Sequence, residues 1–159
     1  ERIGTVHISV EATTVGSGIL LSQDVDIYEG ETAAETVVRM LQNNGYSVDY
    51  TGNYETGFYL ARISSESNFV TGNIPEDLRT KLEEHGFEIY DFTPNSLGDY
   101  DFTKGSGWMY QVNGVYPNYG LSDYCFQNGD TLRLRFTLAY GADIGQDMTG
   151  GSDNWGYEW

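Results

Sequence analysis

The sequence predicts an α+β domain in which a strand-rich sheet packs on one main helix. The clearest evidence is the alternation of apolar and polar residues over Thr131–Leu138, which is typical of a strand with one buried face. A single segment, residues 32–43, instead has helical spacing and a cap at each end. The composition agrees with this class, because aromatic residues make up 14% of the chain and 20 glycines accompany only 3 prolines. That mixture favours strands joined by tight turns.

Period-two alternation predicts several strands. The opening strand covers Ile3–Val10, where Val6, Ile8 and Val10 alternate with His7 and Ser9. Further strands are expected at residues 19–21 with 25–28, at 46–50, at 58–63 and at 108–112.

The main helix is expected from Thr32 to Asn43. The Thr32 hydroxyl can cap the first turn, and Glu35 three residues later completes a capping box. Apolar residues at i, i+3, i+4 and i+7 from Ala34 form one stripe. Gly45 suits a left-handed residue just past the end.

A second, shorter helix is expected over residues 75–85. Pro75 suits its first position and Gly86 its end. Ile74, Leu78 and Leu82 form only a narrow apolar stripe, so this helix is expected to lie on the surface of the sheet.

Turn residues divide the last third of the chain. Asn113–Gly114 and Asn128–Asp130 are strong turn signals, because asparagine and glycine tolerate positive φ. The composition changes at Gly141, after which glycine and polar residues dominate and Lys and Arg are absent. The expected organisation is a domain over 1–140, with an insertion at about 64–101, and an acidic tail over 141–159. The aromatic end of that tail is expected to fold back onto the domain.

Charge and cysteine content restrict the function. The formal net charge is −16, which disfavours nucleic acid as a partner. No apolar run is long enough for a membrane span. Cys125 is the single cysteine, so no intramolecular disulfide is expected, and its neighbours Tyr124 and Phe126 indicate a buried small apolar residue. The start at Glu1 is expected to reflect processing or trimming of a longer protein.

The segment Gly105–Asn118, with the sequence GSGWMYQVNGVYPN, resembles a family signature. The similarity continues through Gly120, Leu121 and Tyr124 to Gly129–Asp130. On these residues the chain resembles the bacterial family described as transcobalamin-like C-terminal, over most of residues 3–145. The family is related to the β domain of transcobalamin and intrinsic factor.

This resemblance implies a β-grasp-like mixed sheet packed on one main helix, with the second helix inserted. It also implies an extracellular or cell-surface module, and cobalamin or another corrinoid as ligand. In transcobalamin and intrinsic factor a helical domain covers the other face of cobalamin, and this chain has no such domain. The resemblance therefore implies weak corrinoid binding by this chain alone.

Catalytic and metal-binding patterns are weak in the sequence. His7 and His85 lie in no motif with a nucleophile, no phosphate-binding loop is present, and no pair of carboxylates stands out for glycoside cleavage. Asp99–Thr103 begins as a calcium loop does, but it lacks the later glycine and glutamate, so a structural turn is the better interpretation. We expect no enzyme activity and no metal site.

Aromatic residues around the Asn113–Gly114 turn are the predicted ligand site. The predicted site residues are Trp108, Tyr110, Asn113, Tyr116 and Tyr119. Flat rings suit a planar macrocycle, a sugar face or a protein partner, although some of them, Trp108 above all, also suit the core. The sequence thus predicts a non-enzymatic extracellular ligand-binding module. The alternative is a cell-surface interaction or adhesion module with a protein or cell-wall partner.

Overall fold

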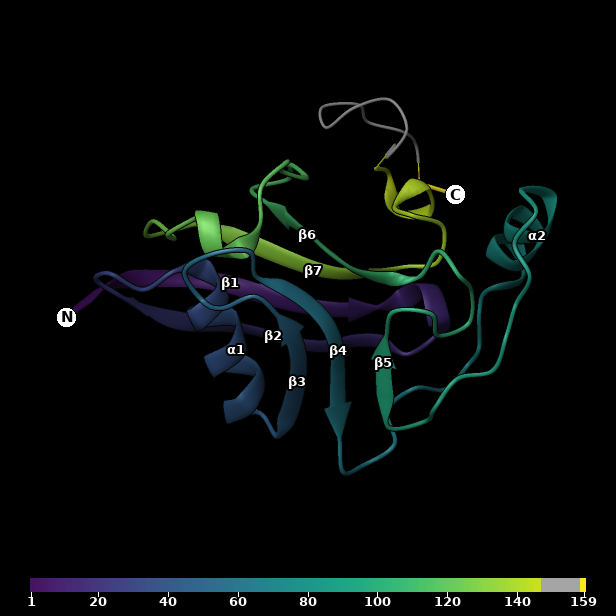
Figure 1. The fold of residues 1–159 in the computed structure, drawn as a ribbon, viewed down its shortest axis with the longest axis horizontal. Helices are drawn as coiled ribbons and strands as arrows, with labels where there is room; N and C mark the ends of the chain where they lie inside the picture. The colour runs from purple at the N-terminus through teal and green to yellow at the C-terminus, as the bar shows by residue number, and fades with distance from the viewer. Residues whose placement is uncertain (147–157) are drawn as a thin grey trace.

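A computed structural model describes residues 1–146 and 158–159, and it has the predicted α+β class. Seven strands and two α-helices follow one another along the described residues (Figure 1). The strands are β1 (Arg2–Ala12), β2 (Gly18–Tyr28), β3 (Tyr46–Thr51), β4 (Tyr59–Ser65), β5 (Ser96–Gly98), β6 (Gly107–Val112) and β7 (Thr131–Thr137). The helices are α1 (Ala33–Asn43) and α2 (Glu76–Glu84), with short 3-10 turns at Thr13–Val15, Leu121–Asp123 and Ala142–Ile144.

The main sheet has four strands in the order β2-β1-β7-β6. Its two central strands, β1 and β7, are parallel, with Ile8 opposite Leu132 and Val10 opposite Leu134. The outer strands pair antiparallel to them as two hairpins. A smaller antiparallel sheet has the order β3-β4-β5, so β5 from the expected insertion completes it.

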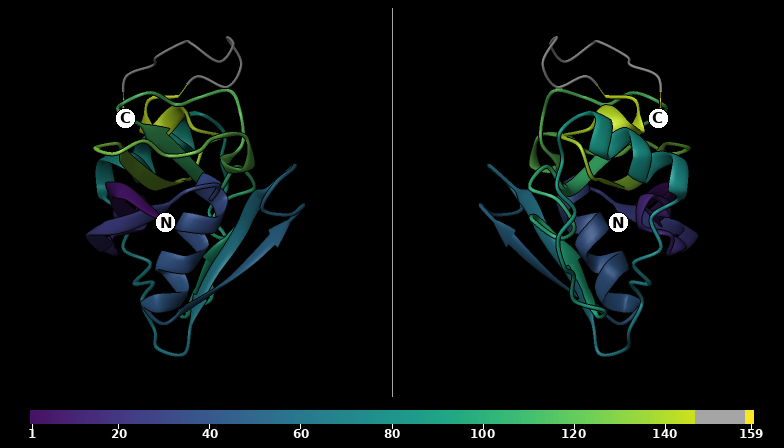
Figure 2. Two further views of the ribbon diagram at one scale, coloured as in Figure 1. Left: turned by 90° about the vertical axis from the view of Figure 1, so that its left-hand side faces the viewer. Right: turned by 90° about the vertical axis from the view of Figure 1, so that its right-hand side faces the viewer.

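The core lies between the main sheet and α1. Figures 1 and 2 show α1 beneath the four-stranded sheet, with the smaller sheet beside it. The apolar face of β7 is buried, because Leu132, Leu134 and Phe136, together with Leu138 just after the strand, are each at most 1% exposed. These side chains belong to one core cluster with the apolar stripe of α1. Alternation on the strand and helical spacing on α1 thus produce the two halves of one interface.

The predicted caps of α1 are confirmed. The Thr32 hydroxyl accepts a hydrogen bond from the Glu35 backbone N–H, and the Glu35 carboxylate accepts one from the Thr32 N–H. Gly45 adopts a φ of 89°, as a left-handed residue after a helix does. The sequence-specified ends therefore fix where the chain leaves the first hairpin and enters β3.

Two positional predictions are wrong. Helix α2 does not lie on the surface of a sheet but at one end of the molecule, beyond the ends of β1 and β2 (Figure 1). Its narrow stripe buries Leu78 and Leu82, which is enough to cover the end of the core but not a face. Cys125 is exposed rather than buried. Phe126 points into the core and Tyr124 packs edge-on against it, so the residue between them faces outward.

The segment after Gly141 begins as part of the packed structure. Asp143 and Ile144 are 4% and 1% exposed and lie over the face of the main sheet opposite α1. Trp159 stacks on His85 at 4.4 Å between ring centroids, so the last described residues contact the domain as expected. Asp147, Asp153, Trp155 and Tyr157 of the predicted tail lie outside the described residues. None of the described helices has the length and apolar character that crossing a membrane requires.

Candidate functional site

A pocket of about 260 Å³ opens beside β6, the edge strand of the main sheet. Four parts of the chain surround it: the start of β4, strand β6, the loop that follows the Asn113–Gly114 turn, and Leu134 of β7. Its lining residues are Phe58, Tyr59, Leu60, Trp108, Met109, Tyr110, Tyr116, Pro117, Tyr119, Gly120, Leu121 and Leu134. Six of these carry aromatic rings, and the wall is mainly apolar.

Strand β6 places Trp108 and Tyr110 on the same face. Trp108 lies opposite Phe136 and Tyr110 opposite Leu134, so both rings share the face of the buried β7 residues. Trp108 is 6% exposed, donates its indole N–H to the Leu97 carbonyl at 2.9 Å, and packs edge-on against Phe136. Trp108 is therefore a core residue that also forms the inner wall of the pocket.

The predicted Asn113–Gly114 turn is confirmed, but it keeps Asn113 out of the pocket. Both residues have positive φ, and Val112 and Val115 exchange backbone hydrogen bonds around them. The Asn113 amide donates to Asp130 Oδ1 at 2.9 Å, and its oxygen accepts from the Thr131 N–H at 2.9 Å. This side chain fixes the β6–β7 hairpin, and it is not among the residues that line the pocket.

The loop tyrosines differ from each other in exposure. Tyr116 is only 2% exposed; its hydroxyl donates to the Ile144 carbonyl at 2.6 Å and accepts from Arg135 at 3.1 Å. Tyr119 is 39% exposed, stacks on Tyr124, and accepts the Tyr110 hydroxyl hydrogen bond at its carbonyl. Tyr116 is thus a wall of the pocket, whereas Tyr119 lies at its mouth.

Strand β4 and the residue before it contribute side chains to the pocket that the sequence did not predict. Phe58, Tyr59 and Leu60 complete the pocket opposite β6, and Tyr59 is 45% exposed. The Tyr59 hydroxyl donates to the Asp99 carboxylate at 2.8 Å. Burial, with help from that carboxylate, raises the pKa of Tyr59. Gly57 followed by two aromatic residues was the only local signal, and it does not show that β4 starts beside β6.

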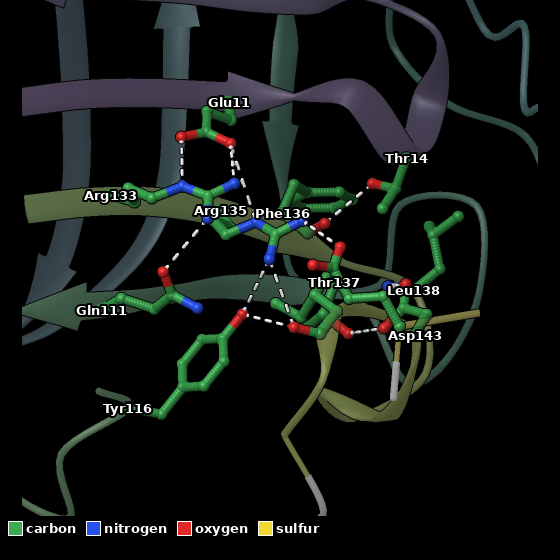
Figure 3. A network of polar contacts seen from close by, with 12 residues as sticks. Glu11, Thr14, Gln111, Tyr116, Arg133, Arg135, Phe136, Thr137, Leu138 and Asp143 are labelled. Carbon is green, nitrogen blue, oxygen red and sulfur yellow. Dashed lines mark hydrogen bonds and ion pairs between the residues drawn. The ribbon is translucent and has the colours of Figure 1, made fainter. Parts of the chain in front are cut away.

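A second cluster, of charged groups, lies on the face of the main sheet opposite the buried apolar side chains of β7 (Figure 3). Arg133 holds the Glu11 carboxylate with two hydrogen bonds of 2.8 Å. Arg135 is 5% exposed and donates to Glu158 at 2.7 Å, while its Nε lies 3.7 Å from Glu11. Burial raises the pKa of Glu11, but bonds from Arg133 and Ser9 and the charges of both arginines outweigh it, so the net shift is downward. We call Glu11, Arg133, Arg135 and Glu158 the buried polar network.

Asp143 joins the buried polar network from the segment after β7. Its carboxylate accepts a hydrogen bond from the Thr137 hydroxyl and one from the Leu138 N–H at 2.7 Å. Burial raises the pKa of Asp143, and those hydrogen bonds only partly oppose the shift. The network therefore fastens residues 141–146 to the sheet.

His7 has a nucleophile beside it that no sequence motif announced. Across the β1–β2 hairpin its Nδ1 lies 2.9 Å from Asp24 Oδ1 and its Nε2 lies 2.9 Å from Ser22 Oγ. This is the order of contacts in a catalytic triad. The His7 and Asp24 side chains are, however, 42% and 78% exposed, and neither lines the pocket beside β6. Water reaches all three groups, which removes the low-dielectric surroundings that such catalysis uses.

Oxygen ligands also fail to gather into a metal centre in the described part of the chain. Across residues 1–146 and 158–159 no group of three or more His, Cys, Asp or Glu side chains is arranged to hold a metal ion. In the calcium-loop-like segment, Asp101 instead accepts hydrogen bonds from Arg62 and from the Gly98 N–H, both at 2.8 Å. Asp101 thus serves a structural turn, and Asp99 accepts the Tyr59 hydroxyl hydrogen bond.

The chain is similar to one family model and to two solved structures. Residues 86–137 match the model of a domain of unknown function, DUF4430. Haptocorrin in complex with Cbi aligns with 87% of this chain and 26% of its own, at 11% identity and a TM-score of 0.44. A candidate metal-binding protein of Ruminococcus gnavus ATCC 29149 aligns with 86% of this chain and 99% of its own, at 12% identity and a TM-score of 0.44. This chain thus spans about a quarter of the haptocorrin chain. No curated protein matches the sequence.

Proposed function

We propose that this domain is a non-enzymatic ligand-binding module and that the aromatic pocket beside β6 is its binding site. The observation that supports this best is an open, mainly apolar pocket bordered by six aromatic rings. Ligand sites are usually concave and apolar with a few placed polar groups. Four of the five predicted site residues border this pocket, and the fifth, Asn113, fixes the hairpin that shapes it.

We also propose that residues 1–140 form a β-grasp-like module with an insertion at about 64–101. The strand order β2-β1-β7-β6, with a parallel central pair and α1 on one face, supports this proposal. An extracellular or cell-surface location is likewise proposed, on the resemblance of the Trp108 segment to the transcobalamin-like family.

A corrinoid is the ligand that the family resemblance suggests. The pocket volume of about 260 Å³ is far below that of a substituted corrin macrocycle, so the pocket would hold one edge of it. Most of the contact area would then be missing, and binding by this chain alone would be weak.

Equilibrium binding to variants of the pocket tests the site. Calorimetry with cobinamide and with small aromatic fragments should give saturable binding to the unaltered chain. Tyr59→Ala and Tyr119→Ala should each weaken it about tenfold or more, because they remove rings at the mouth. Tyr90→Ala is the matched control, since Tyr90 is 46% exposed but does not line the pocket. Binding that is equally strong in all three variants would place the site elsewhere.

The absence of catalysis has its own test at Ser22. The chain should hydrolyse activated esters no faster than buffer and should not react with a fluorophosphonate. Turnover that disappears in both Ser22→Ala and His7→Ala would overturn the non-enzymatic proposal.

A protein-interaction module is the second candidate function. Sheet edges favour it, because β2 and β6 are the outer strands of the main sheet among the described residues, and Ile19 on β2 is 61% exposed. Such edges accept an added strand from a partner. Capture of a cell-wall or host-surface component that is lost on Ile19→Lys, and kept in Tyr59→Ala, would favour this candidate over the pocket.

A further inference from the structure

The side chains around the aromatic pocket offer ring faces and oxygen atoms but few free hydrogen-bond donors. The Trp108 N–H donates to the Leu97 carbonyl at 2.9 Å, and the Tyr59 O–H donates to Asp99 at 2.8 Å. The hydroxyls of Tyr110 and Tyr116 donate to the carbonyls of Tyr119 and Ile144. These four side-chain donors are therefore engaged within the protein, which leaves few side-chain donors for an anionic or strongly accepting ligand.

The charge around the pocket is negative. No Lys, Arg or His lines it. Asp99 accepts a hydrogen bond from the Tyr59 hydroxyl, and Asp123, which accepts one from the Gly120 N–H, adds to the burial that raises the pKa of Tyr110. The guanidinium of Arg135 lies behind Tyr116, is buried, and is balanced by Glu11 and Glu158, and that of Arg62, beside Asp99, is paired with Asp101. With a net charge of −16 on the whole chain, the field at the mouth favours cations.

The backbone edge of β6 does not reverse this preference. The Asn113 N–H donates to the Thr131 carbonyl, so by antiparallel alternation the backbone groups of Trp108 and Tyr110 face the free side. That side presents N–H and C=O groups in turn and carries little net dipole. The side chains around the pocket therefore determine whether it prefers a cationic or an anionic ligand.

We propose, building on the function proposed above, that the pocket recognises a trimethylammonium group. Aromatic faces attract cations, and cages of such rings are how proteins bind quaternary ammonium ligands. A primary ammonium carries three N–H donors that each need an acceptor, whereas a trimethylammonium group carries none and is apolar outside. Its shape and charge suit a mainly apolar pocket of about 260 Å³ in which Tyr59 and Gly120 of the lining donate hydrogen bonds to the carboxylates of Asp99 and Asp123.

Choline and its neutral isostere separate charge from shape. Calorimetry of the full chain with choline and with 3,3-dimethylbutan-1-ol, which replaces N⁺ by carbon, compares ligands of nearly equal size. Choline should bind about tenfold or more tightly than the alcohol, and its affinity should fall as salt is added. Glycerophosphocholine as a third ligand shows whether the group is recognised in a phosphodiester headgroup or as the free alcohol.

Each outcome has a distinct meaning. Equal binding of choline and the isostere would overturn the charge preference and leave the proposed function standing. Binding of cobinamide or an aromatic fragment without choline would also overturn this inference alone. Binding of none of these ligands would remove the proposed function as well.

Pocket variants locate the effect. Tyr59→Leu and Tyr119→Leu should each weaken choline binding about tenfold, because a leucine side chain has no π face. Asp123→Asn should weaken choline but not the isostere. Tyr90→Leu is the control and should leave choline affinity unchanged. Loss of choline binding in Tyr90→Leu, or its retention in both pocket variants, would contradict the assignment.

Discussion

The aromatic pocket and the buried polar network lie on neighbouring strands and meet at Tyr116. The ring of Tyr116 lines the pocket, while its hydroxyl bonds Arg135 and Ile144 in the network. The network holds most of the notable chemistry, with two arginines, two glutamates and Asp143, yet these groups are largely matched with one another. The pocket has no charged lining but leaves open volume. In this molecule the cluster of charged side chains has a structural role, and the open apolar pocket is the better candidate for ligand binding.

The largest effect is expected from Glu11→Gln. It leaves Arg133 and Arg135 without their shared carboxylate, and breaking a buried ion pair costs about 3–5 kcal/mol of unfolding free energy. Chemical denaturation at neutral pH measures this loss, with exposed Glu29→Gln as the control. An unchanged free energy of unfolding would show that the network contributes nothing to stability.

The same pair gives a pH dependence with a defined sign. The pKa of Glu11 is lowered from its ordinary 4.5, so its contribution is present above that value and is lost as pH falls through the lower pKa of the folded state. The stability difference between the unaltered chain and Glu11→Gln should therefore shrink at acid pH. Denaturation curves from neutral to acid pH measure it, and a difference that grows with acidity would contradict the assignment.

Leu134→Ala should come next in size. Leu134 is 1% exposed in the core and also lines the pocket. Its truncation should cost about 2–5 kcal/mol of unfolding free energy, through lost burial and a cavity. Thr131→Ala on the same strand has an exposed side chain and should change stability by less than about 0.5 kcal/mol. Equal unfolding midpoints for the two variants would remove Leu134 from the core.

The smallest stability effect is expected at the mouth of the pocket. Tyr59→Ala removes a 45% exposed ring and its hydrogen bond to Asp99, so the unfolding free energy should fall by about 1 kcal/mol or less. Ligand affinity should fall much further than in Glu11→Gln when both are measured under conditions where they are folded. Loss of binding in Glu11→Gln with retention in Tyr59→Ala would reverse the roles of the two regions.

Local patterns predicted most of the fold. The capping box of α1, the Asn113–Gly114 turn and the apolar face of β7 depend on residues close in sequence, and all are present in the structure. The alternation of apolar and polar residues along β7 correctly predicts that Arg133 and Arg135 point away from the core. It did not predict that this second face is covered too, because the covering residues come from the loop at Tyr116 and the segment after Gly141.

The candidate site was harder to predict for the same reason. β6 and its turn were identified, but Phe58–Leu60 enter the pocket through the packing of β4 beside β6, which no local pattern encodes. The contact of His7 with Ser22 and Asp24 depends on the register of β1 against β2, where a shift by one residue would separate them. The aromatic neighbours of Cys125 do not indicate burial of its side chain, because Phe126 alone points inward and Cys125 is exposed.

The central claim is that ligand binding occurs in the aromatic pocket and not at the buried polar network. A titration of the isotope-labelled full chain with choline, followed by backbone and indole N–H chemical shifts, tests it most directly. Saturable shifts should occur at Trp108, Tyr110 and Tyr119, while the signals of Glu11 and Arg133 stay in place. Saturable shifts confined to Glu11 and Arg133, or no saturable shift with choline, cobinamide or any aromatic fragment, would contradict the account.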